Sequence, residues 1–254
     1  MFWATITLCL LVGASALPLD SRIVNGTDAD PGDVPFIVSL RVNHRHSCGA
    51  TILNEKYLLT AAHCVQNPVD RYSIQYGLTH IISGEDAPNV IKAAKLTPHE
   101  NYVAGNGYVN DVAVIELEDS LPLGPYVQPT TLPPAYNATP ENSIALLAGW
   151  GLPYTNGSVM TDLQKVNILV FPDADCERIH ALTGPTHWSR HVCAGVPEGG
   201  KGQCNGDSGG PLIVDGVQIG IVSWSVKPCT VKGYPGVFAK VSNYVDWIKD
   251  KITS

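Results

Sequence analysis

Three side chains that lie far apart in this sequence could together carry out nucleophilic catalysis. Ser208 lies in a glycine-rich segment, residues 206–211, where glycines on both sides permit a tight turn and close approach of a substrate backbone. His63 follows an apolar strand and precedes Cys64, a rigid setting that suits a general base near neutral pH. Asp111 heads another apolar strand, where a buried carboxylate needs a partner such as an imidazole N–H. These residue types predict a nucleophile, a base and an orienting acid.

The segments that must position these residues have the pattern of antiparallel β-structure. Apolar and β-branched residues alternate with polar ones in short pieces that Gly, Pro, Asn and Asp separate. The clearest pieces are residues 36–42, 57–60, 112–117, 144–148 and 217–224. Helical patterns occur at residues 173–182 and at the C-terminus, where Ser242 could cap a helix with an apolar face of Val241, Tyr244, Val245, Ile248 and Ile252. The pattern predicts an all-β fold with a C-terminal helix.

The N-terminal residues have the pattern of a secretory signal. A short apolar run, residues 2–12, precedes three small residues, so we expect a signal peptide over residues 1–16 and a secreted, extracellular protein. The run is shorter than the roughly 20 apolar residues of a membrane-spanning helix, and no later stretch qualifies. The net charge of -7 disfavours binding to nucleic acid or to a membrane surface.

Removal of the expected signal peptide would leave six cysteines, because Cys9 lies within it. In an oxidising compartment an even number predicts disulfides, here three, but spacing alone cannot choose among the possible pairings. Because no Cys-x-x-Cys pair is present, a zinc site is disfavoured, and we expect no metal and no other cofactor. The other histidines are expected on the surface, namely His44, His46, His80, His99, His180, His187 and His191.

These motifs and their order resemble the chymotrypsin/trypsin family of serine proteases, in which histidine, aspartate and serine follow one another along the chain. The resemblance runs from Ile23 to the C-terminal helix and includes Ile23-Val24-Asn25-Gly26, Gly149-Trp150-Gly151, Ser223-Trp224 and Pro235-Gly236-Val237-Phe238. It implies two packed six-stranded antiparallel β-barrels, with His63 and Asp111 from the first and Ser208 from the second meeting in the cleft between them.

The resemblance also implies a mechanism. Ser208 attacks the scissile carbonyl, His63 takes and returns the proton, and Asp111 orients the imidazole. The backbone N–H groups of Gly206 and Ser208 form the oxyanion hole. The implied disulfides are Cys48–Cys64, Cys176–Cys193 and Cys204–Cys229, a three-bridge set most like that of invertebrate secreted chymotrypsin-like digestive proteases.

Activation by proteolysis is a further implication of the resemblance. Cleavage after Arg22 by a trypsin-like protease would remove a propeptide, residues 17–22, and leave a protease domain of residues 23–254. The new amino group of Ile23 would then pair with Asp207, next to the nucleophile. We expect a monomer whose partners are peptide substrates, this activating protease and protease inhibitors.

By alignment with the family, the primary specificity pocket is lined by Gly202, Gln203, Ser223, Trp224, Ser225 and Gly236. Trypsins carry Asp where this chain has Gly202, so a basic substrate side chain would be buried without a counter-ion. Small residues at Ser225 and Gly236 favour a chymotrypsin-like preference for large apolar residues. Gln203 could shorten the pocket or bind a polar substrate group, which leaves an elastase-like preference open.

Two alternatives remain at this stage. The chain could be a non-catalytic protease homologue that acts as a binding module, although such proteins usually lose a catalytic residue and here all are present. Digestion is the role we expect, and the sequence does not separate it from use in venom.

Three sequons are candidate glycosylation sites, Asn25, Asn137 and Asn156.

Overall fold

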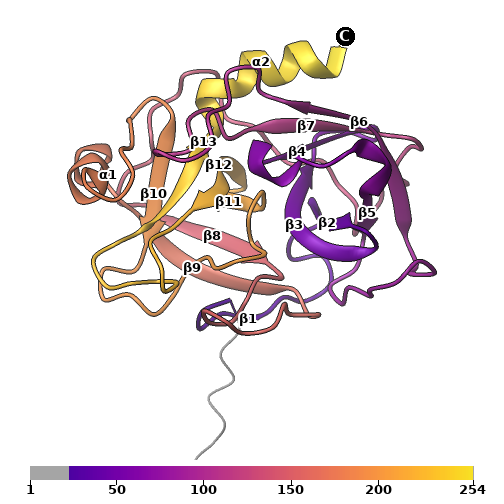
Figure 1. Cartoon of the computed structure of the whole chain (residues 1–254), viewed down its shortest axis with the longest axis horizontal. Coiled ribbons are helices and arrows are strands. Elements are labelled where there is room, and N and C mark those ends of the chain that lie inside the picture. The colour runs from indigo at the N-terminus through magenta and orange to yellow at the C-terminus, as the bar shows by residue number, and fades with distance from the viewer. Residues whose placement is uncertain (1–22, 254) are drawn as a thin grey trace, which may run out of the picture.

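The first half of the chain closes into a six-stranded antiparallel barrel in the computed structural model, which describes residues 23–253 (Figure 1). The expected signal peptide, the propeptide and Arg22 lie outside the described residues. The order of strands around the first barrel is β2 (Ile37–Val42), β3 (Arg45–Ile52), β4 (Tyr57–Thr60), β7 (Ala113–Leu117), β6 (Val90–Pro98) and β5 (Tyr72–Tyr76). Two short 3-10 helices, η1 (Ala62–Cys64) and η2 (Val69–Arg71), follow β4.

The second half forms another antiparallel barrel, drawn in pink, orange and yellow beside the first in Figure 1. The strand β8 (Ile144–Gly149) pairs with both β9 and β11, which closes the ring. The other strands are β9 (Gln164–Val170), β10 (His191–Gly195), β13 (Gly236–Lys240), β12 (Val217–Trp224) and β11 (Pro211–Val214), with β1 (Thr27–Asp28) on the outer edge of β9. The expected pair of six-stranded barrels is confirmed.

Alternation of buried and exposed residues explains why these segments are strands. Along β9, Val166, Ile168 and Val170 point into the core of the second barrel, while the residues between them lie nearer to solvent. This is the period of two that a strand with one buried face requires. The strand predicted to begin at Val112 starts one residue later, because the Val112 N–H donates to the carbonyl of Asn110 in a turn.

Two helices complete the described fold. Helix α1 (Asp173–His180) is shorter than predicted, because the N–H groups of Thr183 and Gly184 both return to the carbonyl of His180. Helix α2 (Val241–Thr253) follows β13 without a loop, so the prediction that Ser242 caps it is wrong. Ser242 lies inside the first turn, and its hydroxyl donates to the carbonyl of Asn137 at 2.9 Å.

Helix α2 belongs to the second half of the sequence but packs on the first barrel. Tyr244, Val245 and Ile248 lie in the same apolar cluster as Leu58 and Ile115, which are core residues of β4 and β7. The helix therefore ties the end of the chain back to the barrel formed by its beginning, as Figure 1 shows at the top of the view. Over residues 23–253, no helix is long and apolar enough to cross a membrane.

Three disulfides connect segments of these barrels. They are Cys48–Cys64, Cys176–Cys193 and Cys204–Cys229, which confirms the pairings that the family resemblance implied. The first bridge fixes η1, which carries His63, to β3 of the first barrel. The third holds the segment before Ser208 to the segment after β12.

Candidate active site

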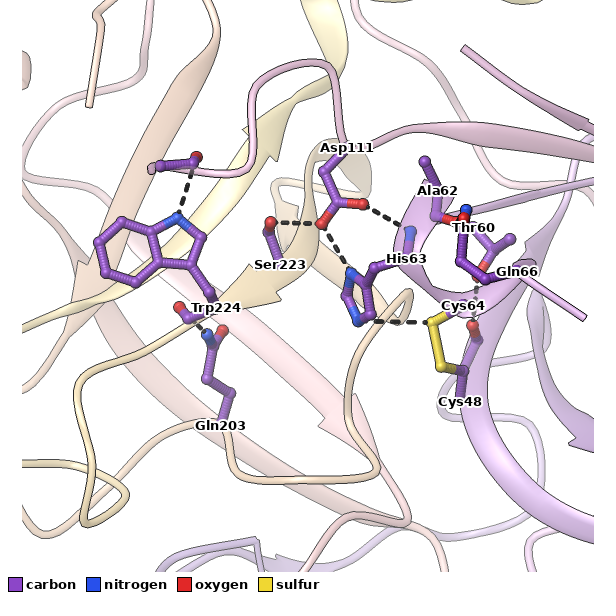
Figure 2. Close-up of polar contacts among 12 residues, drawn as sticks. Cys48, Thr60, Ala62, His63, Cys64, Gln66, Asp111, Gln203, Ser223 and Trp224 are labelled. Atoms are coloured by element: carbon purple, nitrogen blue, oxygen red, sulfur yellow. Dashed lines mark hydrogen bonds and ion pairs between the residues drawn. A yellow bond between two sulfur atoms is a disulfide. The ribbon is translucent and has the colours of Figure 1, made fainter. Parts of the chain in front are cut away.

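His63 and Asp111 form a hydrogen-bonded pair at one end of the first barrel (Figure 2). Asp111 is fully buried just before β7, and its Oδ2 lies 2.7 Å from Nδ1 of His63. Its Oδ1 accepts the backbone N–H of His63 at 2.9 Å, and its Oδ2 also accepts the hydroxyl of Ser223 at 2.5 Å. Three donors therefore compensate the burial of this carboxylate, and they hold Nδ1 as the protonated nitrogen of the imidazole.

Ser208 comes from the second barrel, on the loop that leads into β11. Close contact between this loop and the first barrel requires glycine at positions 209 and 49. A Cβ on Gly209 would lie 2.2 Å from Oγ1 of Thr60, and a Cβ on Gly49 would lie 2.9 Å from the Cα of Gly210. The Gly49 N–H donates to the carbonyl of Ser208 at 2.7 Å. Residues 208–210 therefore pack closely against β3 and β4 of the first barrel, which places Ser208 near His63.

One cavity of about 370 Å³ is lined by both Ser208 and His63. Tyr108, Asn205, Val222 and Lys227 share it with the predicted pocket residues Gln203, Ser223, Trp224 and Ser225, and with Cys204. No hydrogen bond joins Ser208 to His63 in this structure, and Nε2 of His63 lies 3.7 Å from Sγ of Cys64. Catalytic hydrogen bonds of this kind commonly tighten only when substrate is bound.

The predicted oxyanion donors point away from any internal acceptor. Within residues 23–253, neither the N–H of Gly206 nor that of Ser208 has an intramolecular hydrogen-bond partner. The carbonyl of Gly206 is instead turned to Nε2 of His46, at 2.9 Å. Nδ1 of His46 accepts the hydroxyl of Ser39, which leaves Nε2 as the donor. Burial lowers the pKa of His46 to about 4, so this imidazole stays neutral and keeps the Gly206 peptide in place.

Asp207 is completely buried directly before the nucleophile. Its carboxylate accepts the N–H groups of Gly151 and Cys204, both at 2.9 Å. A Cβ on Gly149 or Gly151 would lie 2.2 or 2.3 Å from a carboxylate oxygen, which explains both glycines of the Gly-Trp-Gly motif. Among the described residues no cation forms an ion pair with this carboxylate, and burial raises its pKa from 3.8 to about 7. The Lys227 ammonium opposes this rise in pKa from a distance, so Asp207 has no direct ionic partner among residues 23–253.

The residues after the predicted cleavage site lie against the segment that precedes Asp207. Ile23 is fully buried among core residues of the second barrel, Val24 pairs with Gly202, and the Asn25 side chain donates to the carbonyl of Gly200. The φ angle of Ile23 is +24°, a conformation that a β-branched residue adopts only under strain. Strained backbone is frequent at switch sites.

Gln203 divides the predicted specificity pocket. Its side chain is buried, and its Nε2 donates to the carbonyl of Trp224 at 2.6 Å (Figure 2). A Cβ on Gly236 would lie 2.8 Å from the Gln203 amide carbon, so the amide occupies the space that Gly236 leaves. Gly202 and Gly236 line only a small space of about 10 Å³ behind Gln203, and Ser225 lines both spaces. The main cavity therefore ends at the Gln203 amide.

Sequence reasoning missed several contributors and misplaced three histidines. Tyr108, Asn205, Val222 and Lys227 line the cavity but belong to no motif. The expectation that His46, His180 and His191 lie on the surface is wrong. His180 and His191 are buried and His46 is largely enclosed, and each of the three bonds to a backbone carbonyl of another segment. Nothing in their local sequence distinguishes them from exposed histidines, because the partner carbonyls lie far away along the chain.

Cys48, His63 and Cys64 approach one another as closely as metal ligands do, within 4.8 Å. The two cysteines are joined in a disulfide, however, so neither offers a thiolate. His63 is already engaged with Asp111 through its Nδ1. This cluster is therefore not suited to bind a metal.

Comparison with known proteins gives consistent matches over the whole described chain. A family model described as trypsin matches residues 23–248. Serine protease 1 of Rattus norvegicus is 37% identical to this chain, and the match covers 99% of the length of each of the two chains. A trypsin of Xenopus laevis is 34% identical over 97% of this chain and 98% of its own, and trypsin II-P29 of Gallus gallus is 35% identical over 92% and 91%.

Proposed function

The chain belongs to the trypsin family and is a serine endopeptidase, and we propose that it is secreted as an inactive precursor and acts through Ser208 after cleavage behind Arg22. The observation that carries the catalytic assignment is one cavity shared by Ser208 and by a His63 that Asp111 orients at 2.7 Å. Since both barrels contribute, the site exists only when the two halves are docked.

The proposed reaction forms and then hydrolyses an ester on Ser208. Oγ of Ser208 attacks the scissile carbonyl carbon while its proton passes to Nε2 of His63, and the Asp111 carboxylate stabilises the resulting imidazolium. The carbonyl oxygen becomes an oxyanion that the free N–H groups of Gly206 and Ser208 bind, a contribution of about 3 kcal/mol for each donor. His63 then protonates the leaving amine, and water cleaves the acyl-enzyme by the reverse sequence of steps.

The proposed activation step supplies a direct ionic partner for Asp207. Cleavage after Arg22 turns the backbone nitrogen of Ile23 into an ammonium group and removes the restraint that holds its φ at +24°. Ile23 is buried in the core of the second barrel, and strand β8 of that barrel ends at Gly149, next to the Asp207 carboxylate. A buried carboxylate with a raised pKa is the acceptor that such a cation stabilises.

For the substrate side chain that precedes the scissile bond, called P1, we propose an uncharged apolar group. The cavity contains no carboxylate among the residues that line it, and Lys227 adds a positive charge that repels Arg and Lys. Phe, Tyr and Leu remain the first expectation. The Gln203 amide at the end of the cavity favours the elastase-like alternative, because it shortens the space available.

The setting of the reaction is proposed from the same features. Three disulfides and the apolar N-terminal run support secretion, with dietary proteins as substrates, trypsin-like proteases as activators and a monomeric active form. The bond between His63 and Asp111 and the unpartnered N–H groups of Gly206 and Ser208 support an active enzyme over the non-catalytic alternative.

One experiment tests catalysis and activation together. The secreted precursor is treated with trypsin and then labelled with a fluorescent phosphonate that reacts with activated serines. We expect labelling and peptide hydrolysis only after treatment, with none for Ser208→Ala and none for Arg22→Gln. Labelling of Arg22→Gln after trypsin would move the activation site elsewhere, and hydrolysis by Ser208→Ala would exclude the proposed nucleophile.

A further inference from the structure

A carbonyl of the first barrel receives two hydrogen bonds from the second barrel beside the active site. The Gly107 oxygen accepts Nε2–H of His191 at 2.9 Å and the indole N–H of Trp224 at 3.2 Å. His191 begins β10 and Trp224 ends β12, whereas Gly107 belongs to the segment that leads to Asp111. We call these three residues the Gly107 clasp.

The His191 end of the clasp is fixed in one protonation state. The backbone N–H of His187 donates to Nδ1 of His191 at 3.0 Å, so Nδ1 is an acceptor and Nε2 carries the proton. The imidazole is buried, and this burial lowers its pKa. A neutral ring with both nitrogens engaged is a rigid donor, unlike a flexible side chain that must lose conformational freedom to make the same bond.

The segment that accepts these bonds needs an external support. The φ angles of Gly105, Asn106, Gly107 and Tyr108 are all positive, between +42° and +90°. Asn106 and Tyr108 carry side chains that disfavour this conformation. A Cβ on Gly107 would lie 2.3 Å from the carbonyl oxygen of Pro185, so the segment is pressed against the second barrel. Its own hydrogen bonds, from Val103 to Val109 and from Tyr108 to Gly105, close the turn but do not dock it.

The clasp joins two walls of the substrate cavity. Tyr108 follows Gly107 directly, lines the cavity, and lies edge-on to His63 with ring centres 6.0 Å apart. Trp224 lines the cavity from the second barrel. The proposed placement of the P1 side chain against Gln203 puts the preceding substrate residue, called P2, against Tyr108, the wall beside His63. The distance between the two walls depends on the shared carbonyl.

We propose that His191 is a positioning residue that holds Tyr108 and Trp224 at the separation required by the P2 side chain. This inference rests on the proposed function, because it concerns substrate binding at the same site. His191 touches no substrate and acts through Gly107. Removing its donor should weaken binding of substrates with a bulky P2 residue more than it slows the chemical step on Ser208.

The test compares His191→Gln, which keeps an Nε2 donor at the same reach, with His191→Asn, whose amide is one methylene shorter. His191→Leu removes the donor altogether. Each enzyme is trypsin-activated, titrated with the serine-reactive phosphonate to count active sites, and assayed on two peptides that differ only in Gly or Leu at P2. Ser242→Ala is the matched control, because it removes a different hydrogen bond to a backbone carbonyl, the one from the Ser242 hydroxyl to the Asn137 oxygen at 2.9 Å.

We expect the Leu and Asn variants to raise KM about 10-fold for the Leu peptide and less than about 2-fold for the Gly peptide, with kcat nearly unchanged. The Gln variant should stay within about 3-fold of the parent on both peptides. Equal losses on the two peptides, or no difference between Gln and Asn, would overturn the proposal. If His191→Leu does not fold, the Gln and Asn pair decides alone. Absence of phosphonate labelling in the parent would instead count against the proposed function.

Discussion

The hydroxyl of Ser223, on the second barrel, donates to the carboxylate of Asp111, on the first, at 2.5 Å. Because a hydrogen bond to a buried charge contributes about 1.5–3 kcal/mol, Ser223→Ala should lower kcat roughly 10-fold to 100-fold by loosening the orientation of His63. KM should change less than about 2-fold. Steady-state kinetics on titrated enzyme measures both constants. A kcat within 2-fold of the parent would show that Asp111 needs no support from Ser223.

Asp207 should make the uncleaved precursor less stable as the pH rises. In the folded Arg22→Gln protein its pKa is raised to about 7, whereas in the unfolded chain it titrates near 4. Between these values the folded state binds more protons, so the free energy of unfolding falls as the pH increases. Thermal unfolding at pH 4.5 and pH 7 should show this decrease, and Asp207→Asn in the same background should remove it.

Cleavage should reverse that dependence. The ammonium group of Ile23 would favour the charged form of Asp207 and bring its pKa down, so the mature enzyme should lose stability toward acid instead. For the Asp207→Asn control, the change of melting temperature with pH is compared rather than the melting temperature itself. The asparagine amide also loses one of the two hydrogen bonds that the Asp207 carboxylate accepts from the backbone, which lowers the stability at every pH. Identical slopes for precursor and mature enzyme would argue against pairing of Ile23 with Asp207.

Gly151→Ala should abolish activity without a change to any catalytic side chain. The added Cβ would lie 2.3 Å from Oδ2 of Asp207 and would displace the carboxylate that holds the loop before Ser208. We expect a loss of more than about 100-fold in kcat/KM and no labelling by the phosphonate. Gly124→Ala is the matched control, because a Cβ at Gly124 meets nothing within 4 Å, and it should be indistinguishable from the parent.

Gln203→Ser should deepen the specificity pocket. Shortening this side chain would join the space lined by Gly202 and Gly236 to the main cavity. On a peptide library varied at P1, the preference for Phe over Val should rise about 10-fold, the order expected for apolar groups that gain buried area. Lys201→Ser, an exposed change on the same loop, should leave the ratio unaltered. A dominant signal for Arg or Lys in the parent would refute the pocket argument.

Glycosylation should occur at Asn156 in preference to Asn25. Asn156 is exposed in a turn, whereas Nδ2 of Asn25, the atom that would carry the glycan, donates to the carbonyl of Gly200 at 2.7 Å. Asn137 is exposed, but the Thr139 of its sequon is buried and bonds to Asp173. Mass spectrometry of the secreted protein, before and after removal of N-glycans, reports occupancy at each site. Full occupancy of Asn25 would contradict the docking of residues 23–26 described above.

The barrels, the disulfide pairing and the presence of His63 and Ser208 on one cavity could be predicted, because strand periodicity and family motifs are local in the sequence. The residues at which the helices begin and end could not be predicted. Helix α1 ends at His180 because of backbone bonds that no side-chain pattern encodes, and α2 begins without a cap because β13 runs directly into it.

The contacts between the barrels were also beyond sequence reasoning. The family resemblance predicts Ser223 in the specificity pocket, and Ser223 lines the cavity shared by His63 and Ser208, but its bond to Asp111 depends on how the two barrels meet. The same holds for His191 and Gly107, which are 84 positions apart. The sequence shows that Gln203 departs from the family pattern, but only the fold shows that its amide turns to the Trp224 carbonyl and fills the space beside Gly236. Long-range geometry decides each of these cases.

The packing of α2 on the first barrel makes the two halves of the molecule depend on each other for stability. Tyr244, Val245 and Ile248 complete the core around Leu58 and Ile115, although they follow the last strand of the second barrel. Detachment of the helix would expose apolar surface of the first barrel to water. The two barrels should therefore unfold together in one cooperative transition.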